Sequence, residues 1–368
     1  MRFYQGRHKF YCGIDLHAKK MFLCVLDEQG SVVLHRNIKT DPDSLRRALQ
    51  PFREDLIIGV ECMFSWYWLA DWCREENIPF VLGHALYMKA IHGGKAKNDK
   101  LDSEKIARLL RGGTFPLAYV YPQEMRGTRD LLRRRTFLVR RRAELLAHVQ
   151  NTYTQYNIRV TSGWGRDRLR EDDPTAPFAD ESVKFMLRSD ISVIERFDET
   201  IVKLESHLIR HAKVDDPIRF QLLRTIPGVG PILALVMLYE VHDIDRFAGI
   251  GPFVSYARLV ACSHESNGKK LGTGGRKIGN AHLKWAFGEA AALMIRETDE
   301  AKAFVEKMTK QRGKARAVAL LAAKLGRAVY WMMKRKQPYD AALLWKGCLP
   351  RSRRSPKTQP EQLATVTN

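Results

Sequence analysis

Four acidic residues occupy positions where a carboxylate needs an explanation. Asp15 lies inside an apolar run, and Glu61 directly follows another. Asp99 and Asp102 stand three residues apart at the start of a predicted helix, which puts both on one helix face. A buried carboxylate is costly unless it is paired or bound to a metal, and four converging acids repel one another unless divalent cations neutralise them. The set therefore predicts a metal site that holds Mg²⁺, most simply two ions, with Mn²⁺ as a plausible substitute.

Each of these acids also has an ordinary structural interpretation. Asp99 could cap a helix N-terminus, Asp102 could interact with the helix dipole, and Glu61 could simply be exposed. Their order along the chain, on a strand, a second strand and a helix, favours a joint role. Two bound cations activate a nucleophile and stabilise a leaving oxygen, so we expect metal-dependent phosphoryl transfer.

A second group of residues suited to chemistry lies toward the C-terminus. In the motif 226–231, Gly228 and Gly230 could present backbone N–H groups to phosphate, although such a turn can equally be a plain helix start. A glycine-rich and lysine-rich loop follows over 262–280, and a serine in it could either attack DNA or only contact phosphate. The basic residues of this loop predicted to bind nucleic acid are Lys269, Lys270, Arg276 and Lys277.

The charge balance points to a polyanionic partner. The chain has 62 Lys and Arg against 41 Asp and Glu, a net charge of +21, and such an excess is self-repelling unless nucleic acid or a similar partner neutralises it. Residues 216–368 carry 26 basic and 12 acidic residues, whereas 1–120 carry 18 and 14. We therefore expect the carboxylate chemistry and the nucleic-acid surface to be separate.

Composition also excludes several classes of protein. No apolar run approaches the roughly 18 residues of a membrane span, and the start of the sequence lacks the pattern of a secretory signal. The six cysteines have no zinc-like spacing. We expect a cytoplasmic protein without a membrane partner, associated with the nucleoid of a bacterium or archaeon.

The elements that must position the acids follow from apolar periodicity. Three strands with a Glu-Gln-Gly turn between the last two predict an antiparallel meander. Alternating helices and strands follow, which implies parallel pairing. The predicted strands cover residues 11–16, 21–26, 32–38, 56–60 and 80–82. This order is typical of ribonuclease H-like nucleases, so we expect an α/β domain of that fold over 1–121.

The middle of the chain, 122–215, is predicted to hold two long helices joined by a linker near 161–181. The first runs from Gln123 to about Tyr156, and its arginines predicted to bind phosphate are Arg133, Arg134, Arg140 and Arg141. The second has a coiled-coil seam made of Ile194, Phe197, Ile201, Leu204, Leu208 and His211. That seam could pack the two helices together within one chain, or it could join two chains. The remainder is predicted as a mostly helical domain over 216–346 and a disordered basic tail over 347–368.

Together these motifs resemble the DEDD-type insertion-sequence transposases, the family described as bridge-RNA-guided recombinases. The resemblance runs from Tyr11 to about Lys346. Its N-terminal signature is carried by Gly13-Ile14-Asp15, Val60-Glu61 and residues 97–102, and its C-terminal signature by residues 226–230, 266–269 and 277–280.

The resemblance implies a RuvC-like domain, a coiled-coil region and a C-terminal transposase domain. It also implies that Asp15, Glu61, Asp99 and Asp102 bind Mg²⁺, that Ser266 forms a transient covalent link to DNA, and that a noncoding RNA selects donor and target. A homodimer or homotetramer is expected. Many relatives carry Gly-Leu-Val-Pro before the serine, where this chain has Arg-Leu-Val-Ala at 258–261, and Ser263 lies close by as a second candidate nucleophile.

The function expected is therefore that of a transposase or recombinase, which cleaves and rejoins DNA strands to move an insertion sequence. Two other functions fit the residues. A RuvC-like nuclease or junction resolvase would cut with metal-activated water and need no serine, and a non-catalytic nucleic-acid-binding protein would use the four acids structurally. A covalent protein–DNA intermediate separates the first two functions, and metal-dependent strand cleavage excludes the last.

Overall fold

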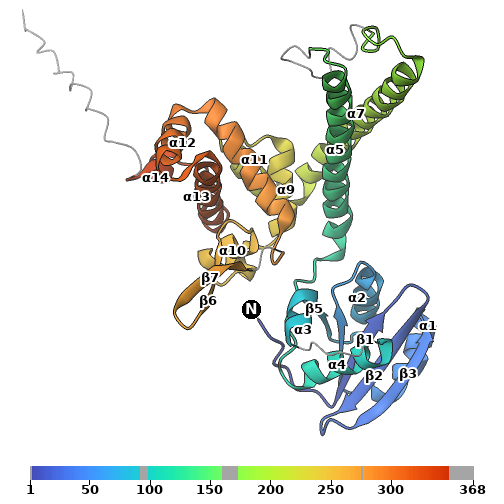
Figure 1. The fold of residues 1–368 in the computed structure, drawn as a ribbon. Helices are drawn as coiled ribbons and strands as arrows, with labels where there is room; N and C mark the ends of the chain where they lie inside the picture. Colours follow the sequence, from blue (N-terminus) through green and yellow to red (C-terminus); the bar gives the residue numbers. More distant parts are fainter. Residues whose placement is uncertain (1, 92–97, 160–172, 275–276, 348–368) are drawn as a thin grey trace, which may run out of the picture. The chain divides into compact units, whose positions relative to one another are not determined.

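The computed structural model describes residues 2–91, 98–159, 173–274 and 277–347, with the backbone alone for 90, 212–215, 262–265 and 270–274 (Figure 1). Most of the predicted linker and nearly all of the predicted tail lie outside these residues. The chain forms two compact units, Met1–Gly127 and Thr128–Asn368. Among the described helices, none combines the length and the apolar character that crossing a membrane requires.

The N-terminal unit is built on a five-stranded mixed sheet of order β3-β2-β1-β4-β5 (Figure 1). Its strands are β1 (Phe10–Leu16), β2 (Lys20–Asp27), β3 (Val32–Lys39), β4 (Leu56–Glu61) and β5 (Phe80–Gly83). The first three strands pair antiparallel, and β4 and β5 continue the sheet in parallel beside β1. The predicted meander and the predicted parallel strands are both present in the structure.

Helices cover both faces of this sheet. They are α1 (Pro42–Leu49), α2 (Trp66–Glu75), α3 (Ala85–Ile91) and α4 (Asp99–Arg111). Because side chains alternate along a strand, Ile14 and Leu16 pack in one core with α1 and α2, whereas Tyr11 packs in the other core with α4. The short α3 was not predicted from the sequence.

Helix α4 lies directly on the sheet because two strand positions have no side chain. A Cβ atom on Gly13 would lie 2.2 Å from the Ser103 carbonyl oxygen and 2.4 Å from the Ala107 nitrogen, both backbone atoms of α4. On the neighbouring strand, a Cβ on Gly59 would lie 2.6 Å from Leu110. The glycines therefore set how closely α4 approaches β1 and β4.

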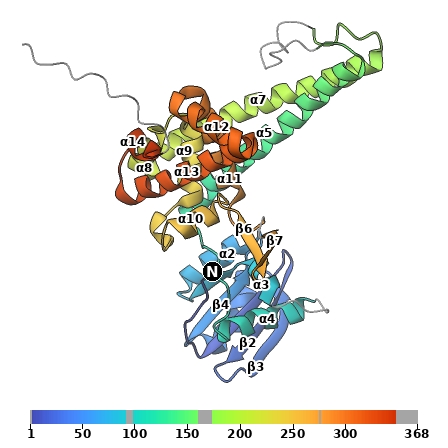
Figure 2. The same cartoon turned by 60° about the vertical axis from the view of Figure 1, so that its left-hand side comes forward.

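The helix α5 (Gln123–Gln155) begins at the end of the N-terminal unit, and in the C-terminal unit it forms an antiparallel hairpin with α7 (Glu181–Asp215) (Figure 2). Three cross-helix contacts define its register: Arg135 with Glu205, Arg142 with Asp198 and His148 with Asp190. Seam residues Ile194, Ile201 and Leu208 are buried within the chain. The seam is therefore used inside one chain, and its use between chains stays a prediction.

The rest of this unit is a helical body with one β-hairpin. Its elements are α8 (Pro217–Arg224), α9 (Pro231–Val241), α10 (Ile250–Tyr256), β6 (Cys262–Ser266), β7 (Lys269–Gly274), α11 (Ala281–Glu297), α12 (Asp299–Arg312), α13 (Lys314–Arg335) and α14 (Ala341–Trp345). Every residue of α9 from Leu233 to Val241 is buried. A helix that is buried all round lies in the centre of its domain, and α9 also buries one charged residue, Glu240.

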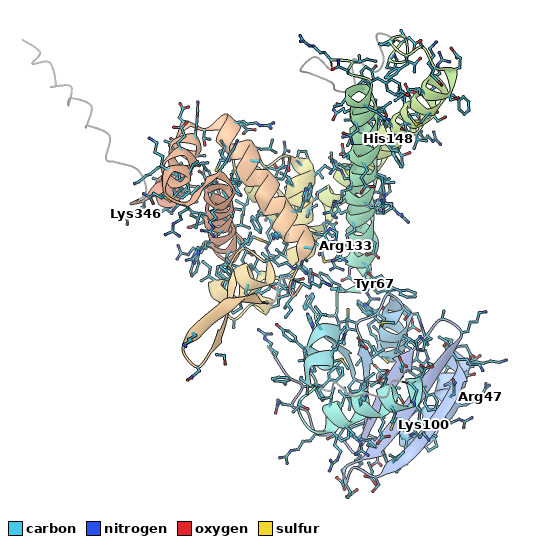
Figure 3. All side chains as sticks on the ribbon, in the orientation of Figure 1. Arg47, Tyr67, Lys100, Arg133, His148 and Lys346 are labelled. Carbon is cyan, nitrogen blue, oxygen red and sulfur yellow. The ribbon has the colours of Figure 1, made fainter. Side chains whose placement is uncertain are left out.

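The Glu240 carboxylate is 1% exposed and accepts hydrogen bonds from three side chains. Arg129 donates at 3.0 Å and Arg133 at 2.7 and 3.0 Å. Both arginines lie on α5, where Arg133 is labelled in Figure 3. Asn280 donates at 2.8 Å, and its own carbonyl oxygen caps the start of α11. Burial alone would raise the pKa of Glu240, but the hydrogen bond from Arg133 and the charges of both arginines outweigh it and lower the pKa to about 2.

We predict that Gly13→Ala destabilises the protein by about 1–3 kcal/mol, because the added methyl group meets helix backbone that cannot rotate away. Urea denaturation monitored by circular dichroism measures the change. Gly127→Ala is the matched control, since nothing lies within 4 Å of its Cβ position and alanine favours a helix over glycine by about 1 kcal/mol. Equal stability of the two variants would contradict the assigned role of Gly13.

We also predict that Glu240→Gln lowers the free energy of unfolding at neutral pH by about 3–5 kcal/mol, because two arginines lose their buried partner. The folded-state pKa lies below the ordinary value of 4.5, so this stabilisation is present above pH 4.5 and is lost as the pH falls toward about 2. The gap between wild type and variant should therefore close over that range in urea titrations.

Glu205→Gln is the control for this experiment. Its partner Arg135 also lies on α5, but the Glu205 side chain is 28% exposed, so its loss should change stability by no more than about 1 kcal/mol. A difference between wild type and Glu240→Gln that did not vary with pH would show that the carboxylate charge is not what stabilises this network.

Candidate metal centre and nucleic-acid interface

Asp15 and Glu61 lie side by side in the order of the sheet. The register pairs Ile14 of β1 with Val60 of β4, so the two acids are the next residues along neighbouring parallel strands. Each acid follows by two positions a glycine that faces α4, and alternation therefore directs both toward the α4 face of the sheet. The strand ends bring together one pair of the four predicted ligands on this face.

The other pair belongs to the first turn of α4. The Asn98 side chain caps this helix by accepting a hydrogen bond from the Leu101 N–H at 2.8 Å. Asp99 is therefore not the N-cap, and that ordinary explanation for it is wrong. Asp102 accepts a hydrogen bond from Lys105 at 3.1 Å, one turn further along.

His17, a residue not predicted from the sequence, joins the two pairs. Its Nε2 lies 3.3 Å from Asp15 Oδ2 and 3.6 Å from Asp99 Oδ1. Possible ligand atoms of these three residues all lie within 4.8 Å of one another. The structure thus brings a β1 acid and an α4 acid together around an imidazole. The available signal was the spacing of two between Asp15 and His17, which is the spacing of neighbours on one strand face.

Electrostatics favours a cation at this position. Burial raises the pKa of Asp15 above its ordinary value, His17 opposes the rise, and the charges of Asp99 and Asp102 add to it. The charged form of the Asp15 carboxylate is therefore less stable here than in water. A nearby divalent ion would stabilise the charged form and so lower the pKa again. The carboxylate oxygens of this set are the donors that suit Mg²⁺ and Mn²⁺. By donor chemistry, the set fits a divalent metal.

The candidate serine lies at the tip of the β6–β7 hairpin. Asn267 and Gly268 form the turn with φ angles of 49° and 72°, which is the chemistry of a tight two-residue hairpin. Ser266 pairs with Lys269 across the turn, and both are exposed. The expectation of a loop is therefore wrong for residues 262–274, which form a hairpin, and the Asn-Gly pair at its turn is a recognised hairpin signal. The Ser263, Lys270 and Arg276 side chains lie outside the described residues.

Hydrogen bonds to backbone carbonyl groups hold the segment that follows this hairpin. Arg258 donates to the carbonyl oxygens of Lys277 and Ile278, the latter at 3.0 Å, and the Asn280 N–H donates to the Tyr256 carbonyl at 2.6 Å. Arg258 has a φ of 55°, the left-handed conformation in which glycine is preferred. A glycine would adopt this conformation without strain, whereas the arginine here also braces the segment after the hairpin through its side chain.

The predicted phosphate-binding arginines of α5 differ in their surroundings. Arg133 is half-buried and bound to Glu240, so its charge is already neutralised within the protein. Arg134, Arg140 and Arg141 are exposed, and Arg141 forms an ion pair with the exposed Glu144 at 2.6 Å. These three remain predicted phosphate contacts, while Arg133 has a structural partner.

The two glycines of the 226–231 turn also differ. The Gly228 N–H donates to the Glu297 carboxylate at 2.6 Å, and a Cβ there would lie 2.7 Å from the Met294 nitrogen. Gly228 therefore serves close packing against α11. Gly230 precedes α9 with open space around its Cβ position and no side-chain cap on the helix, so it remains a predicted phosphate contact.

Two family models match different parts of the chain. Residues 12–158 match a family described as "Transposase", of the DEDD type, and residues 220–306 match the "Transposase IS116/IS110/IS902 family". The first match contains the four acids, and the second contains the turn at 226–231 and the serine hairpin.

Two bacterial proteins are similar over most of their length. The transposase for insertion sequence element IS1111A of Coxiella burnetii is 26% identical over 341 residues, which cover 89% of this chain and 90% of that protein. A probable family 20 transposase of Pseudomonas aeruginosa is 23% identical, with 89% and 97% covered. Because both family models match this chain, and a transposase is similar to it over about nine tenths of both proteins, the chain belongs to the IS110 family of DEDD-type transposases.

Proposed function

We propose that this transposase cleaves and rejoins DNA strands to move an insertion sequence, using a ribonuclease H-like domain whose acids hold Mg²⁺. The observation that carries the proposal is the convergence of Asp15 and Asp99 on His17 at 3.3 and 3.6 Å, beside Asp102 and at the end of the strand next to Glu61. The sheet order and the helix packed on it support the same fold.

Each residue has a distinct part in this proposal. Asp15, Glu61, Asp99 and Asp102 would hold the metal, which supplies positive charge that stabilises the transferring phosphate and its leaving oxygen. His17 would orient the Asp15 and Asp99 carboxylates. The exposed arginines of α5, together with Lys269 and Lys277, would hold the DNA backbone.

Ser266 is proposed as the nucleophile. Its Oγ forms a bond to phosphorus while the bond to the leaving deoxyribose oxygen breaks, the hydroxyl proton passes to solvent, and the leaving oxygen gains a proton. One P–O bond replaces another, so the energy of the phosphodiester is kept for rejoining. Placement at an exposed hairpin tip with Lys269 opposite supports this role, because the cation would face the phosphate.

The family resemblance supports two further parts of the proposal. A noncoding RNA from the element selects donor and target DNA, and the protein acts as a homodimer or homotetramer. A nuclease or resolvase that uses water is the alternative function, and it predicts strand cleavage without any covalent protein–DNA adduct.

For the metal site, we predict that Asp15→Asn, Glu61→Gln, Asp99→Asn and Asp102→Asn each reduce strand cleavage by at least about a hundredfold, because each removes a metal ligand. Mg²⁺ should raise the melting temperature of wild type but not of Asp15→Asn. Without metal, Asp15→Asn should be at least as stable as wild type, since burial disfavours the charged carboxylate.

Asp43→Asn is the control for the carboxylate variants, because the Asp43 side chain is 74% exposed on α1 and forms an ion pair with Arg46 across one helical turn. It should behave like wild type in cleavage and in the Mg²⁺-dependent melting shift. Full cleavage by two or more of the four site variants would overturn the proposed metal site.

For the serine, we predict that Ser266→Ala forms no covalent protein–DNA adduct, whereas Ser263→Ala still forms one. The assay supplies DNA ends of the element together with RNA transcribed from it, and denaturing gel electrophoresis detects the adduct. Adduct formation by Ser266→Ala would refute the assignment, and strand cleavage by wild type without any adduct would favour the resolvase.

A further inference from the structure

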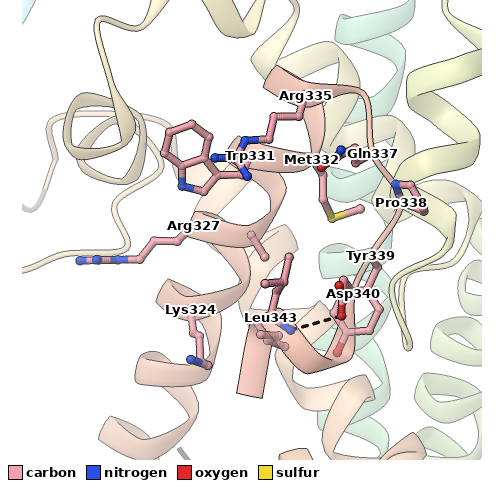
Figure 4. Close-up of a pocket in the computed structure, with 12 residues that line it drawn as sticks. Lys324, Arg327, Trp331, Met332, Arg335, Gln337, Pro338, Tyr339, Asp340 and Leu343 are labelled. Carbon is pink, nitrogen blue, oxygen red and sulfur yellow. Dashed lines mark hydrogen bonds between the residues drawn. The ribbon is translucent and has the colours of Figure 1, made fainter. Parts of the chain in front are cut away.

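A cavity of about 330 Å³ lies between α13 and α14, far along the chain from the serine and the acids (Figure 4). Part of its lining is apolar and includes the buried Met332 and Leu344. The volume is at the lower end of the roughly 300–1,000 Å³ that small-ligand sites occupy. It would admit one or two flat rings but not the stacked base pairs of a duplex.

Two large apolar side chains at this cavity are exposed to solvent. Trp331 is 44% exposed and Leu343 is 65% exposed, and both line the cavity. Exposed tryptophan is unfavourable in water and is enriched where a protein contacts a partner. An aromatic or apolar group of a ligand would remove this surface from water.

Cations surround the tryptophan on one face of α13. Lys324, Arg327 and Arg335 line the cavity with Trp331, at helical steps that put them on one side of the helix. The Arg335 guanidinium lies 4.5 Å from the centre of the Trp331 ring, which leaves its N–H groups to face an anion. Within the part of the chain that the structure describes, no acidic side chain forms an ion pair with any of these three cations.

The acid among the residues that line the cavity, Asp340, serves as a helix cap. Asp340 caps α14 by accepting a hydrogen bond from the Leu343 N–H at 3.2 Å (Figure 4). The site therefore combines an aromatic face, apolar side chains and three cations with a single carboxylate that caps α14 and, among the described residues, forms no ion pair with them. Planar rings joined to phosphates have matching chemistry, because bases stack on aromatic side chains while phosphates bind arginine and lysine.

We propose that this pocket, defined by Lys324, Arg327, Trp331, Arg335, Tyr339 and Leu343, binds an unpaired nucleotide of a single-stranded nucleic acid. The base enters the cavity against Trp331, and the flanking phosphates contact Lys324, Arg327 and Arg335. The inference rests on the proposed function in that it requires a nucleic-acid partner, and it adds a site separate from the cleavage chemistry.

The test measures binding of the full chain to a fluorescent single strand of about 12 thymidines and to a duplex of equal length, by anisotropy. Trp331→Ala should weaken single-strand binding about tenfold or more, because stacking contributes about 1–3 kcal/mol per base. Duplex binding should change much less, and Trp331→Phe should recover part of the loss. Arg327→Ala should reduce the slope of log affinity against log salt by about 0.7 or less.

Phe185→Ala is the matched control, because Phe185 is an aromatic residue of α7 that is 73% exposed and distant in the chain from the pocket. It should leave single-strand affinity unchanged. Replacing thymidine with 4-thiothymidine should give a photo-crosslink within residues 324–344, identified by mass spectrometry. Circular dichroism checks that each variant is folded.

Three results would overturn the proposal. They are unchanged single-strand affinity in Trp331→Ala, an equal loss for the duplex, and a change in oligomeric state alone, which would make the pocket a protein contact. A cleavage assay on the wild-type protein tells failure of the pocket proposal apart from failure of the proposed function. A wild type that cleaves with Mg²⁺ while Trp331→Ala binds single strands normally refutes only the pocket.

Discussion

The buried carboxylate of Glu240 is the interaction on which the C-terminal unit depends. It joins α5 through Arg129 and Arg133, α9 through its own backbone, and the start of α11 through Asn280. A buried charge with several fixed donors tolerates few alternative arrangements, because any shift leaves an arginine or the carboxylate unpaired. Since Asn280 also ends the segment that follows the serine hairpin, the base of that hairpin is tied to the same buried charge.

The N-terminal unit depends instead on two strand positions that carry no side chain. Gly13 and Gly59 let α4 lie on the sheet backbone, and this contact brings the first turn of the helix to the strand positions that carry acids. Close packing and electrostatic repulsion are therefore in conflict at the same place. Tight helix packing brings the carboxylates together, and burial with neighbouring charges raises the pKa of Asp15. A divalent cation would relieve the conflict.

Much of this arrangement could be predicted because it is encoded locally. Strand alternation predicted the sheet, and spacing predicted that Asp99 and Asp102 share a helix face. Contacts between distant segments could not be predicted in this way. The pairing of Arg133 with Glu240 joins residues 107 positions apart, so an arginine that the sequence suggests for DNA serves the core instead. His17 was missed because its meeting with Asp99 depends on how α4 packs. The serine hairpin was missed although Asn267-Gly268 is a local signal.

The side-chain contacts between α5 and α7 fix the register of the two helices. Its cross-helix contacts advance by seven and six residues along α5 and retreat by seven and eight along α7, in step with buried Ile194, Ile201 and Leu208. Sliding one arm by a single residue would turn the seam by about 100° and separate all three contacts. Evolution can therefore lengthen or shorten this arm readily only by whole heptads taken from both helices together. The length of the hairpin can therefore change only in steps of about 10 Å, which is the length of one heptad.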